Sequence, residues 1–295
     1  MKKDGFLGVV QFIHPGSEHK INKTGWTNWN LRTHQRKFMA VEGESIDSHG
    51  NKRSSGLHFW GEWEGPSRSI YSWGSNPDAL PSHLVLPEFP GSASPIDGLQ
   101  NTDPYVFGDA FKYTLCKQVN KKGHYLFLTR LLPGTLVLFG SSVNSQFVLD
   151  TAMVVGDEII HHSSKDWEVA LSHHTPAYRA MTLEPMYWDK STRDDSIFTL
   201  YQGATNETPK NQIYSFSPCI VATDASNRFA RPCIKLPGVV NQKLMMAQKG
   251  TQMSISEIQE CWTNVVTQTF NQGLLLGVKF AEPQLNKVPD HVWPH

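Results

Sequence analysis

Runs of apolar residues along the chain predict a protein built mainly from β-strands. Residues 6–13, FLGVVQFI, predict a buried first strand. Residues 58–67 alternate apolar and polar side chains and predict a strand that ends at Gly65-Pro66. Residues 135–141 and 146–155 predict a hairpin in the core, because only a short polar turn separates them. Further strands are expected at residues 197–201, 213–222 and 274–280.

The pattern strongly indicates one helix, close to the carboxyl end. Ser254 and Glu257 have the spacing of a capping box. Apolar side chains then recur on one face, at Ile258, Trp262 and Val265, before Gly273. We therefore expect a helix between Ser254 and Gly273.

Long polar connections separate the predicted strands. Residues 24–39 predict a short helix or a loop, residues 42–56 a turn-rich connector, and the proline-rich residues 74–98 a long wrapped loop. No composition break marks a linker. We expect one α+β domain over residues 1–295, with a largely antiparallel or mixed β-sheet core, long loops and few helices.

Composition narrows the class of protein. Apolar residues make up 39% and charged residues 18% of the 295 positions, which is typical of a globular chain. Lys+Arg and Asp+Glu number 27 each, so a broad polyphosphate-binding surface is disfavoured while a local basic groove is not. With no signal peptide and no membrane-length apolar run, we expect a cytoplasmic protein that does not bind membranes.

Cysteine and histidine spacing disfavours a metal site. The four cysteines form no C-x-x-C pair, and they are expected to be reduced thiols. The neighbouring pairs His161-His162 and His173-His174 would point to opposite faces of an extended chain, so each pair supplies one ligand easily. No phosphate-binding glycine motif is present. The sequence therefore predicts neither a metal nor a cofactor.

Residues 100–116, QNTDPYVFGDAFKYTLC, hold the strongest indication of a site. Carboxylates and an amide stand among aromatic rings there, at Asn101, Asp103, Tyr105, Phe107, Asp109, Phe111 and Tyr113. Carboxylates among rings on a stiff turn suit a pocket that grips a flat ligand and performs acid–base chemistry on it. Asp-Pro is equally typical of a turn that the Asp side chain caps, and this alternative stays open for Asp103.

A second group of rings and carboxylates lies in the strand WGEWEGPS. Trp60 and Trp63 flank Glu62 and Glu64, which suits the stacking face of a sugar site. The alternative is a half-buried strand with Trp facing the core and Glu facing solvent. Asp150 lies inside an apolar strand, so we expect it to pair with a buried partner such as an Arg or to point into the pocket.

Asp103-Pro104-Tyr105 resembles the core of the GQDPYH motif of uracil-DNA glycosylases. A later HPSP loop of that family is similar to His173-His174-Thr175-Pro176 here. The resemblance implies that Asp103 activates water, that Tyr105 guards the base pocket, and that His173 or His174 stabilises the departing base. Asp109 shares the turn and is a second candidate for the catalytic carboxylate.

The WGEWEGPS strand, the QNTDPYVFGD turn and the VLFGS…FVLDT hairpin together are similar to bacterial proteins associated with DNA modification and phage defence. The resemblance implies a DNA glycosylase that removes glucosylated hydroxymethylcytosine from modified phage DNA. Such an enzyme takes its base out of the stack and holds it between rings. The expected base-pocket residues are Tyr105 with Phe107 or Phe111, and Asn101 or Asn144 would read a base edge.

Phosphate contacts are expected from Arg32, Arg36, Lys37 and Arg179. Two other classes of function stay open. One is a non-enzymatic reader of modified bases, a β-rich barrel with an aromatic cage. The other is an NAD-dependent or other transferase that modifies nucleic acid.

Overall fold

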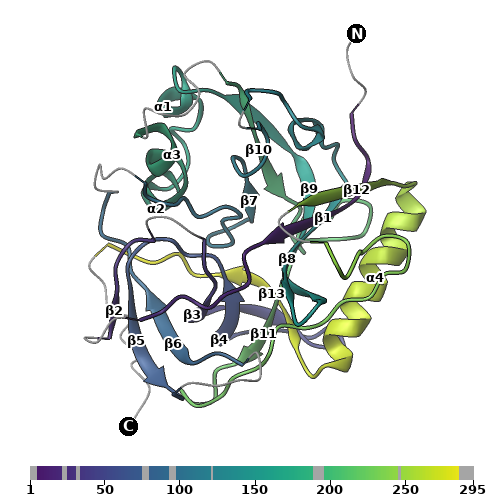
Figure 1. Cartoon of the computed structure of the whole chain (residues 1–295). Coiled ribbons are helices and arrows are strands. Elements are labelled where there is room, and N and C mark those ends of the chain that lie inside the picture. The colour runs from purple at the N-terminus through teal and green to yellow at the C-terminus, as the bar shows by residue number, and fades with distance from the viewer. Residues whose placement is uncertain are drawn as a thin grey trace.

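The structure, a computed structural model, describes residues 5–21, 25–30, 34–74, 80–92, 98–120, 122–188, 196–244 and 247–285. Two mixed β-sheets and a few helices make up this part of the chain (Figure 1). The predicted α+β class with a β-rich core is therefore confirmed. The single-domain expectation stays a prediction.

The first sheet has six strands. Their order across the sheet is β12 (Gln248–Gln252), β1 (Gly8–His14), β8 (Leu136–Val143), β9 (Gln146–His162), β10 (Phe198–Gly203) and β7 (Lys112–Tyr113). β1 and β8 run parallel, and the other pairs run antiparallel. β9 is long enough to pair with β8 along its first half and with β10 along its second.

The second sheet has seven strands, ordered β13 (Leu275–Phe280), β11 (Ser217–Val221), β4 (Lys52–Gly61), β3 (Lys37–Ile46), β6 (His83–Pro87), β5 (Ser67–Ser72) and β2 (Trp26–Thr27). β13 also pairs with β3, so β3, β4, β11 and β13 close into a ring. β3 and β4 pair along their whole length, and Lys37 stands opposite Gly61 at one end.

The longest helix covers the junction of the two sheets. α4 (Ile255–Asn271) packs Ile258 and Val265 into a hydrophobic cluster that holds Val9 of the first sheet and Leu276 of the second. The short elements α1 (Trp167–Ala170), α2 (Pro176–Tyr178), a π-helical turn (Arg179–Leu183) and α3 (Glu184–Trp188) follow β9. Figure 1 shows them gathered in the corner opposite α4. A 3-10 turn (Phe127–Arg130) precedes β8.

Most predicted elements are confirmed: the first strand, the hairpin of β8 and β9, the three later strands and the capped helix. The expected connector at 42–56 is wrong, because those residues form the second half of β3, its turn and the first half of β4. The expected strand at 58–67 is wrong for its centre, because β4 ends at Gly61 and residues 62–66 lie in no strand. The expected wrapped loop at 74–98 contains β6, while residues 75–79 and 93–97 lie outside the described part. Exposed polar side chains along the β3–β4 hairpin concealed it from the hydrophobic pattern.

Within the described residues, no helix is long and apolar enough to cross a membrane.

The capping box of α4 yields a test of how this helix is held. Ser254 Oγ accepts the Glu257 N–H, and the Glu257 carboxylate accepts the Ser254 N–H. We expect Ser254→Ala to lower the free energy of unfolding by about 1 kcal/mol, because a helix-terminal N–H loses its acceptor. Urea denaturation measures the change. Glu257→Gln, which keeps an acceptor at that position, is the matched control and should cost less; equal losses would contradict the cap's role.

Candidate functional site

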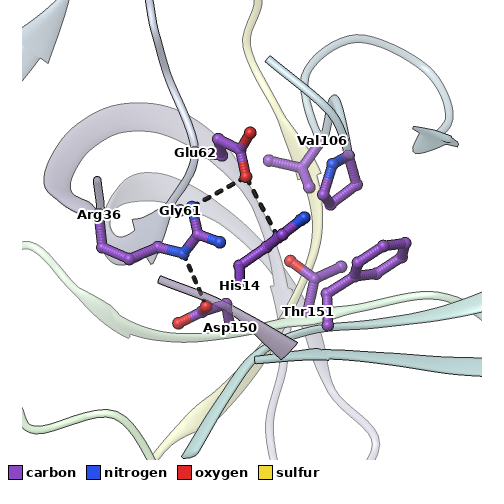
Figure 2. A pocket seen from close by; sticks show the side chains of 9 residues that line it. His14, Arg36, Gly61, Glu62, Val106, Asp150 and Thr151 are labelled. Atoms are coloured by element: carbon purple, nitrogen blue, oxygen red, sulfur yellow. Dashed lines mark hydrogen bonds and ion pairs between the residues drawn. The ribbon is translucent and has the colours of Figure 1, made fainter. Parts of the chain in front are cut away.

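A cluster of buried charged side chains lies where the two sheets meet. Its centre is Glu62, which follows β4 and is only 4% exposed. Arg36 donates from Nη1 to Glu62 Oε2 at 2.8 Å and from Nε to Asp150 Oδ2 at 2.9 Å. Asp150 belongs to β9 and also lies 3.4 Å from Arg231 Nη1. The predicted buried Arg partner of Asp150 is confirmed, and the chain of ion pairs joins the sheets (Figure 2).

A second carboxylate lies beside the first. Glu62 and Glu64 are two residues apart and both contact His34, while Trp63 between them packs in the apolar core. His34 Nδ1 lies 2.9 Å from Glu62 Oε1 and 3.2 Å from Glu64 Oε1. Glu64 is fully buried, and its Oε2 has no hydrogen-bond partner among the described residues. Two carboxylates thus converge on one imidazole nitrogen.

The His34 imidazole is also close to a thiol and is partly exposed to solvent. The Cys116 thiol lies close enough to His34 for each group to shift the pKa of the other. The His34 side chain is 19% exposed, whereas those of Glu62 and Glu64 are 2% and 0% exposed. Among His34, Glu62 and Glu64, the His34 side chain is therefore the most accessible to solvent.

The environment separates the pKa values of these groups. Burial opposes the charge of Glu62, but the cations around it, Arg36 foremost, lower its pKa to about 2. Burial raises the pKa of Glu64. Burial also opposes protonation of His34, yet the charge of Glu62 raises its pKa well above the usual value.

A small cavity adjoins Glu62. Its volume is about 10 Å³, room for one water, and its wall includes His14, Arg36, Pro104, Val106 and Asp150. Figure 2 shows the His14 ring directed towards Glu62, and the Nδ1–Oε2 distance is 3.4 Å. His14 Nε2 is buried without a hydrogen-bond partner in the described part of the chain. Burial lowers the pKa of His14, so its ring is neutral near pH 7.

Asp103, the predicted catalytic residue, is completely buried and organises its own turn. Its carboxylate accepts the N–H groups of Thr114 (2.9 Å), Leu115 (2.7 Å) and Cys116 (2.6 Å). Burial raises its pKa to about 7, and these three donors act against that rise. The turn still forms part of the site, because the Asp103 N–H lies 3.3 Å from Glu62 Oε1. This geometry fits the turn-capping alternative for the side chain.

The rings predicted to hold a base are core residues in this structure. Tyr105, Phe107, Phe111 and Trp63 pack in one hydrophobic cluster and are at most 2% exposed. Trp60 packs in a neighbouring cluster and donates from Nε1 to Phe229 O. The prediction that these rings face a pocket is not met in this conformation. Their apolar surface already finds partners in the cores of the sheets.

The histidine loop comes close to Tyr105 rather than to Asp103. Thr175 Oγ1 and Tyr105 Oη both donate to Glu282 Oε1, and Tyr105 packs edge-on against Tyr178. The sequence predicted the two motifs to be partners, and Glu282 joins them. Within the described residues, no hydrogen bond or ion pair links His173 or His174 to Asp103.

The remaining candidates lie apart from the cluster. Asp109 is exposed and pairs with Lys279 at 2.7 Å. Asn144 lies in the exposed tight turn between β8 and β9. His173 Nε2 lies 3.6 Å from Glu158, and burial lowers the pKa of His174 to about 3. Asn101, half-buried next to Thr102, has an Nδ2 without a partner in the described part of the chain.

The predicted phosphate contacts are contradicted for two residues. Arg36 and Lys37 are 1% and 2% exposed, and Lys37 Nζ donates to Gly65 O at 2.7 Å. Both side chains are buried at the start of β3, where they bind interior partners and cannot reach a phosphate at the surface. Arg179 is half-buried with its guanidinium 5.6 Å from the Trp167 ring. Arg32 lies outside the described residues.

Sequence reasoning missed His14, His34 and Cys116 as members of the cluster. Glu64 was noted only as a flank of the Trp pair. The available signal was the Glu-Trp-Glu alternation at the end of an otherwise apolar strand, which places two carboxylates on the same side. The histidines and the thiol come from separate segments, so only folding brings them together.

Comparison with protein-family models, with curated proteins and with solved structures finds no match for this chain.

The pH dependence of stability tests whether Lys37 is buried with a lowered pKa. Burial lowers its pKa to about 7, while the unfolded chain stays protonated to a much higher pH. Between about pH 7 and about pH 9 the unfolded state binds more protons, so the free energy of unfolding should rise relative to Lys37→Met by about 2 kcal/mol. Urea denaturation of both proteins at the two pH values measures this. An identical pH dependence would show that Lys37 is solvated.

Asp103→Asn tests the anchoring role of that side chain. An amide keeps one acceptor oxygen where the carboxylate has two, so N–H groups of residues 114–116 lose their acceptor. We expect the free energy of unfolding to fall by about 2 kcal/mol. Thermal denaturation measures the loss, and Asp109→Asn on the exposed side of the turn is the matched control. An unchanged Asp103→Asn stability would contradict the anchoring role.

Proposed function

We propose that the protein hydrolyses an N-glycosidic bond at the Glu62–Glu64–His34 centre and releases a modified base from DNA. The observation that carries the proposal is the convergence of two buried carboxylates on one imidazole nitrogen, with His34 Nδ1 at 2.9 Å and 3.2 Å from them. Hydrolysis of glycosidic bonds typically uses two acidic groups, one to activate water or stabilise the sugar cation and one to protonate the leaving group.

Glu62 is suited to act as the carboxylate that stays ionised during the reaction. Arg36 binds its Oε2, and Arg36 is itself held by Asp150, so the carboxylate is fixed in one orientation. Its Oε1 faces His34. The ionised Glu62 stabilises the positive charge that develops on the sugar as water attacks the anomeric carbon, and the proton that the water loses passes to solvent. The bond between that carbon and the base nitrogen breaks, and its electron pair leaves with the base.

His34 and Glu64 are the groups suited to donate the proton that the leaving base takes up. The His34 imidazole is the accessible edge of the centre, and Glu64 lies directly behind it. A proton passed from Glu64 through the imidazole to the base nitrogen neutralises the charge that the leaving base would carry, and Glu64 regains a proton from solvent. The substrate approaches from the exposed side of His34.

The sequence supplies the substrate class. WGEWEGPS, which carries both carboxylates, is one of the three segments that are similar to defence-associated proteins. That resemblance favours modified cytosine, in particular the glucosylated hydroxymethylated base of phage DNA. Relative to the sequence-based hypothesis, the role of the ionised carboxylate moves from Asp103 to Glu62, because three backbone amides already occupy the Asp103 carboxylate.

Glu62→Gln tests the proposal on DNA that contains glucosylated hydroxymethylcytosine. We expect the wild-type protein to release the free base, detected by mass spectrometry, and to leave abasic sites that alkali cleaves. The variant should lose about 100-fold or more of this rate, because an amide carries no negative charge to stabilise the sugar cation. Circular dichroism and thermal denaturation verify that the variant is folded.

Glu158→Gln, which changes a half-exposed carboxylate on β9, is the matched control and should keep the wild-type rate. Wild-type activity in folded Glu62→Gln would contradict the assignment of Glu62. Tight binding of modified DNA without any free base would overturn the hydrolase and favour the reader of modified bases, whose barrel has a counterpart in the ring of β3, β4, β11 and β13.

A further inference from the structure

The three groups that meet at the imidazole have the arrangement of metal ligands. His34 Nδ1 and one oxygen each of Glu62 and Glu64 lie within 4.8 Å of one another. The two nitrogen–oxygen distances are 2.9 Å and 3.2 Å. Ligands about 2.1 Å from a cation, at octahedral to tetrahedral angles, are separated by roughly 3.0 to 3.4 Å. The observed nitrogen–oxygen distances are therefore close to those between ligands of one shared cation.

Unsatisfied polar atoms at the same place provide an independent observation. Glu64 is completely buried, and its Oε2 has no hydrogen-bond partner among the described residues. The other side of Glu62 is already committed to Arg36, which has Asp150 as its second partner. A single imidazole N–H can serve two carboxylates only by a shared, weaker hydrogen bond. The buried Oε2 of Glu64 is therefore left for a partner that the described residues do not supply, and a cation would satisfy it.

We propose that His34, Glu62 and Glu64 bind a divalent transition-metal cation, with Zn²⁺ as the best fit. An imidazole nitrogen favours Zn²⁺ over Mg²⁺, which prefers oxygen ligands and keeps several waters. The Cys116 thiol next to His34 adds a soft sulfur to the surroundings. Three protein ligands leave a coordination position for water, as in catalytic zinc sites.

The cation binding itself is independent of the reaction; only the use of its water rests on the proposed function. In the cation-bound protein, the cation would make a bound water more acidic, and Glu62 and Glu64 would be its ionised ligands. The proton relay through Glu64 therefore belongs to the cation-free protein. The proposal departs from the sequence analysis, which predicted no metal because it considered Cys pairs and neighbouring histidines. The ligands identified here come from one histidine and a Glu-x-Glu segment.

A second cluster in the described part of the chain, Glu158, His173 and His174, has ligand atoms equally close together. Its Glu158 and His173 side chains are 41% and 55% exposed. Exposed ligands are already hydrated, and the Lys112 ammonium acts electrostatically on His174. The buried cluster is therefore the stronger candidate, and the exposed one serves as an internal control.

Calorimetric titration of ZnCl₂ into the full chain, after chelator treatment and dialysis, tests the proposal. We expect one Zn²⁺ per chain, and visible absorption bands when Co²⁺ replaces it. Glu64→Gln should weaken Zn²⁺ binding by about 100-fold, because an amide is a poor ligand. Oε2 of Glu64 has no hydrogen-bond partner among the described residues, so this variant is expected to fold. Glu158→Gln is the matched control and should bind Zn²⁺ like the wild-type protein.

Absence of Zn²⁺ binding by the folded, chelator-treated wild-type protein would overturn the proposal. Binding that survives Glu64→Gln but is lost in Glu158→Gln would also overturn it, by assigning the cation to the exposed cluster. If Glu64→Gln does not fold, His34→Gln replaces it, and a rise in the wild-type melting temperature with Zn²⁺ but not Mg²⁺ supports the site.

The base-release assay separates the two proposals. Zn²⁺ binding at Glu64 without base release would leave the cation site standing and overturn the hydrolase. Base release by the chelator-treated protein at the full rate, with no Zn²⁺ bound, would overturn the use of the cation's water in the reaction and leave the hydrolase standing.

Discussion

The bridge from Glu62 through Arg36 to Asp150 is the interaction around which the interior is arranged. It joins a residue that follows the second sheet's β4 to a residue of the first sheet's β9, and all three side chains are at most 6% exposed. Removing one partner from such a bridge leaves an uncompensated charge in the core, which costs several kcal/mol, about 3 to 5. The two sheets are thus coupled by a contact that has little tolerance for change.

This bridge also fixes the geometry of the candidate site. Arg36 holds one oxygen of Glu62 and leaves the other facing His34. Apolar residues of similar size would hold two sheets together at least as well, so stability alone does not account for buried carboxylates here. Groups whose pKa values are displaced in opposite directions, as those of Glu62 and Glu64 are, tend to gather at functional sites.

The turn at residues 100–116 connects the bridge to the rest of the molecule. Its start donates a backbone N–H to Glu62, and its end places the Cys116 thiol against His34. Asp103 keeps these two ends in register by accepting three N–H groups. This segment, rich in rings and carboxylates, thus forms one wall of the candidate site. Its rings fill the core behind that wall, and Asp103 holds it closed.

The sequence by itself determined the β-rich core, the β8–β9 hairpin and the capped α4. Apolar runs, short turns and a capping box are local signals, and they act over a few residues. It also indicated that Asp150 needs a buried cation, since an unpaired carboxylate inside an apolar strand is too costly. It drew attention to residues 100–116 and to the Glu-Trp-Glu segment.

Only the tertiary structure decided which of these side chains meet. Arg36 and Lys37 look like surface cations in sequence, yet the pairing of β3 with β4 and the neighbouring sheet carries them inside. His14, His34, Glu62 and Cys116 are separated by up to about a hundred residues, and no local pattern links them. Their proximity follows from the packing of two sheets whose charges must be balanced where water is excluded.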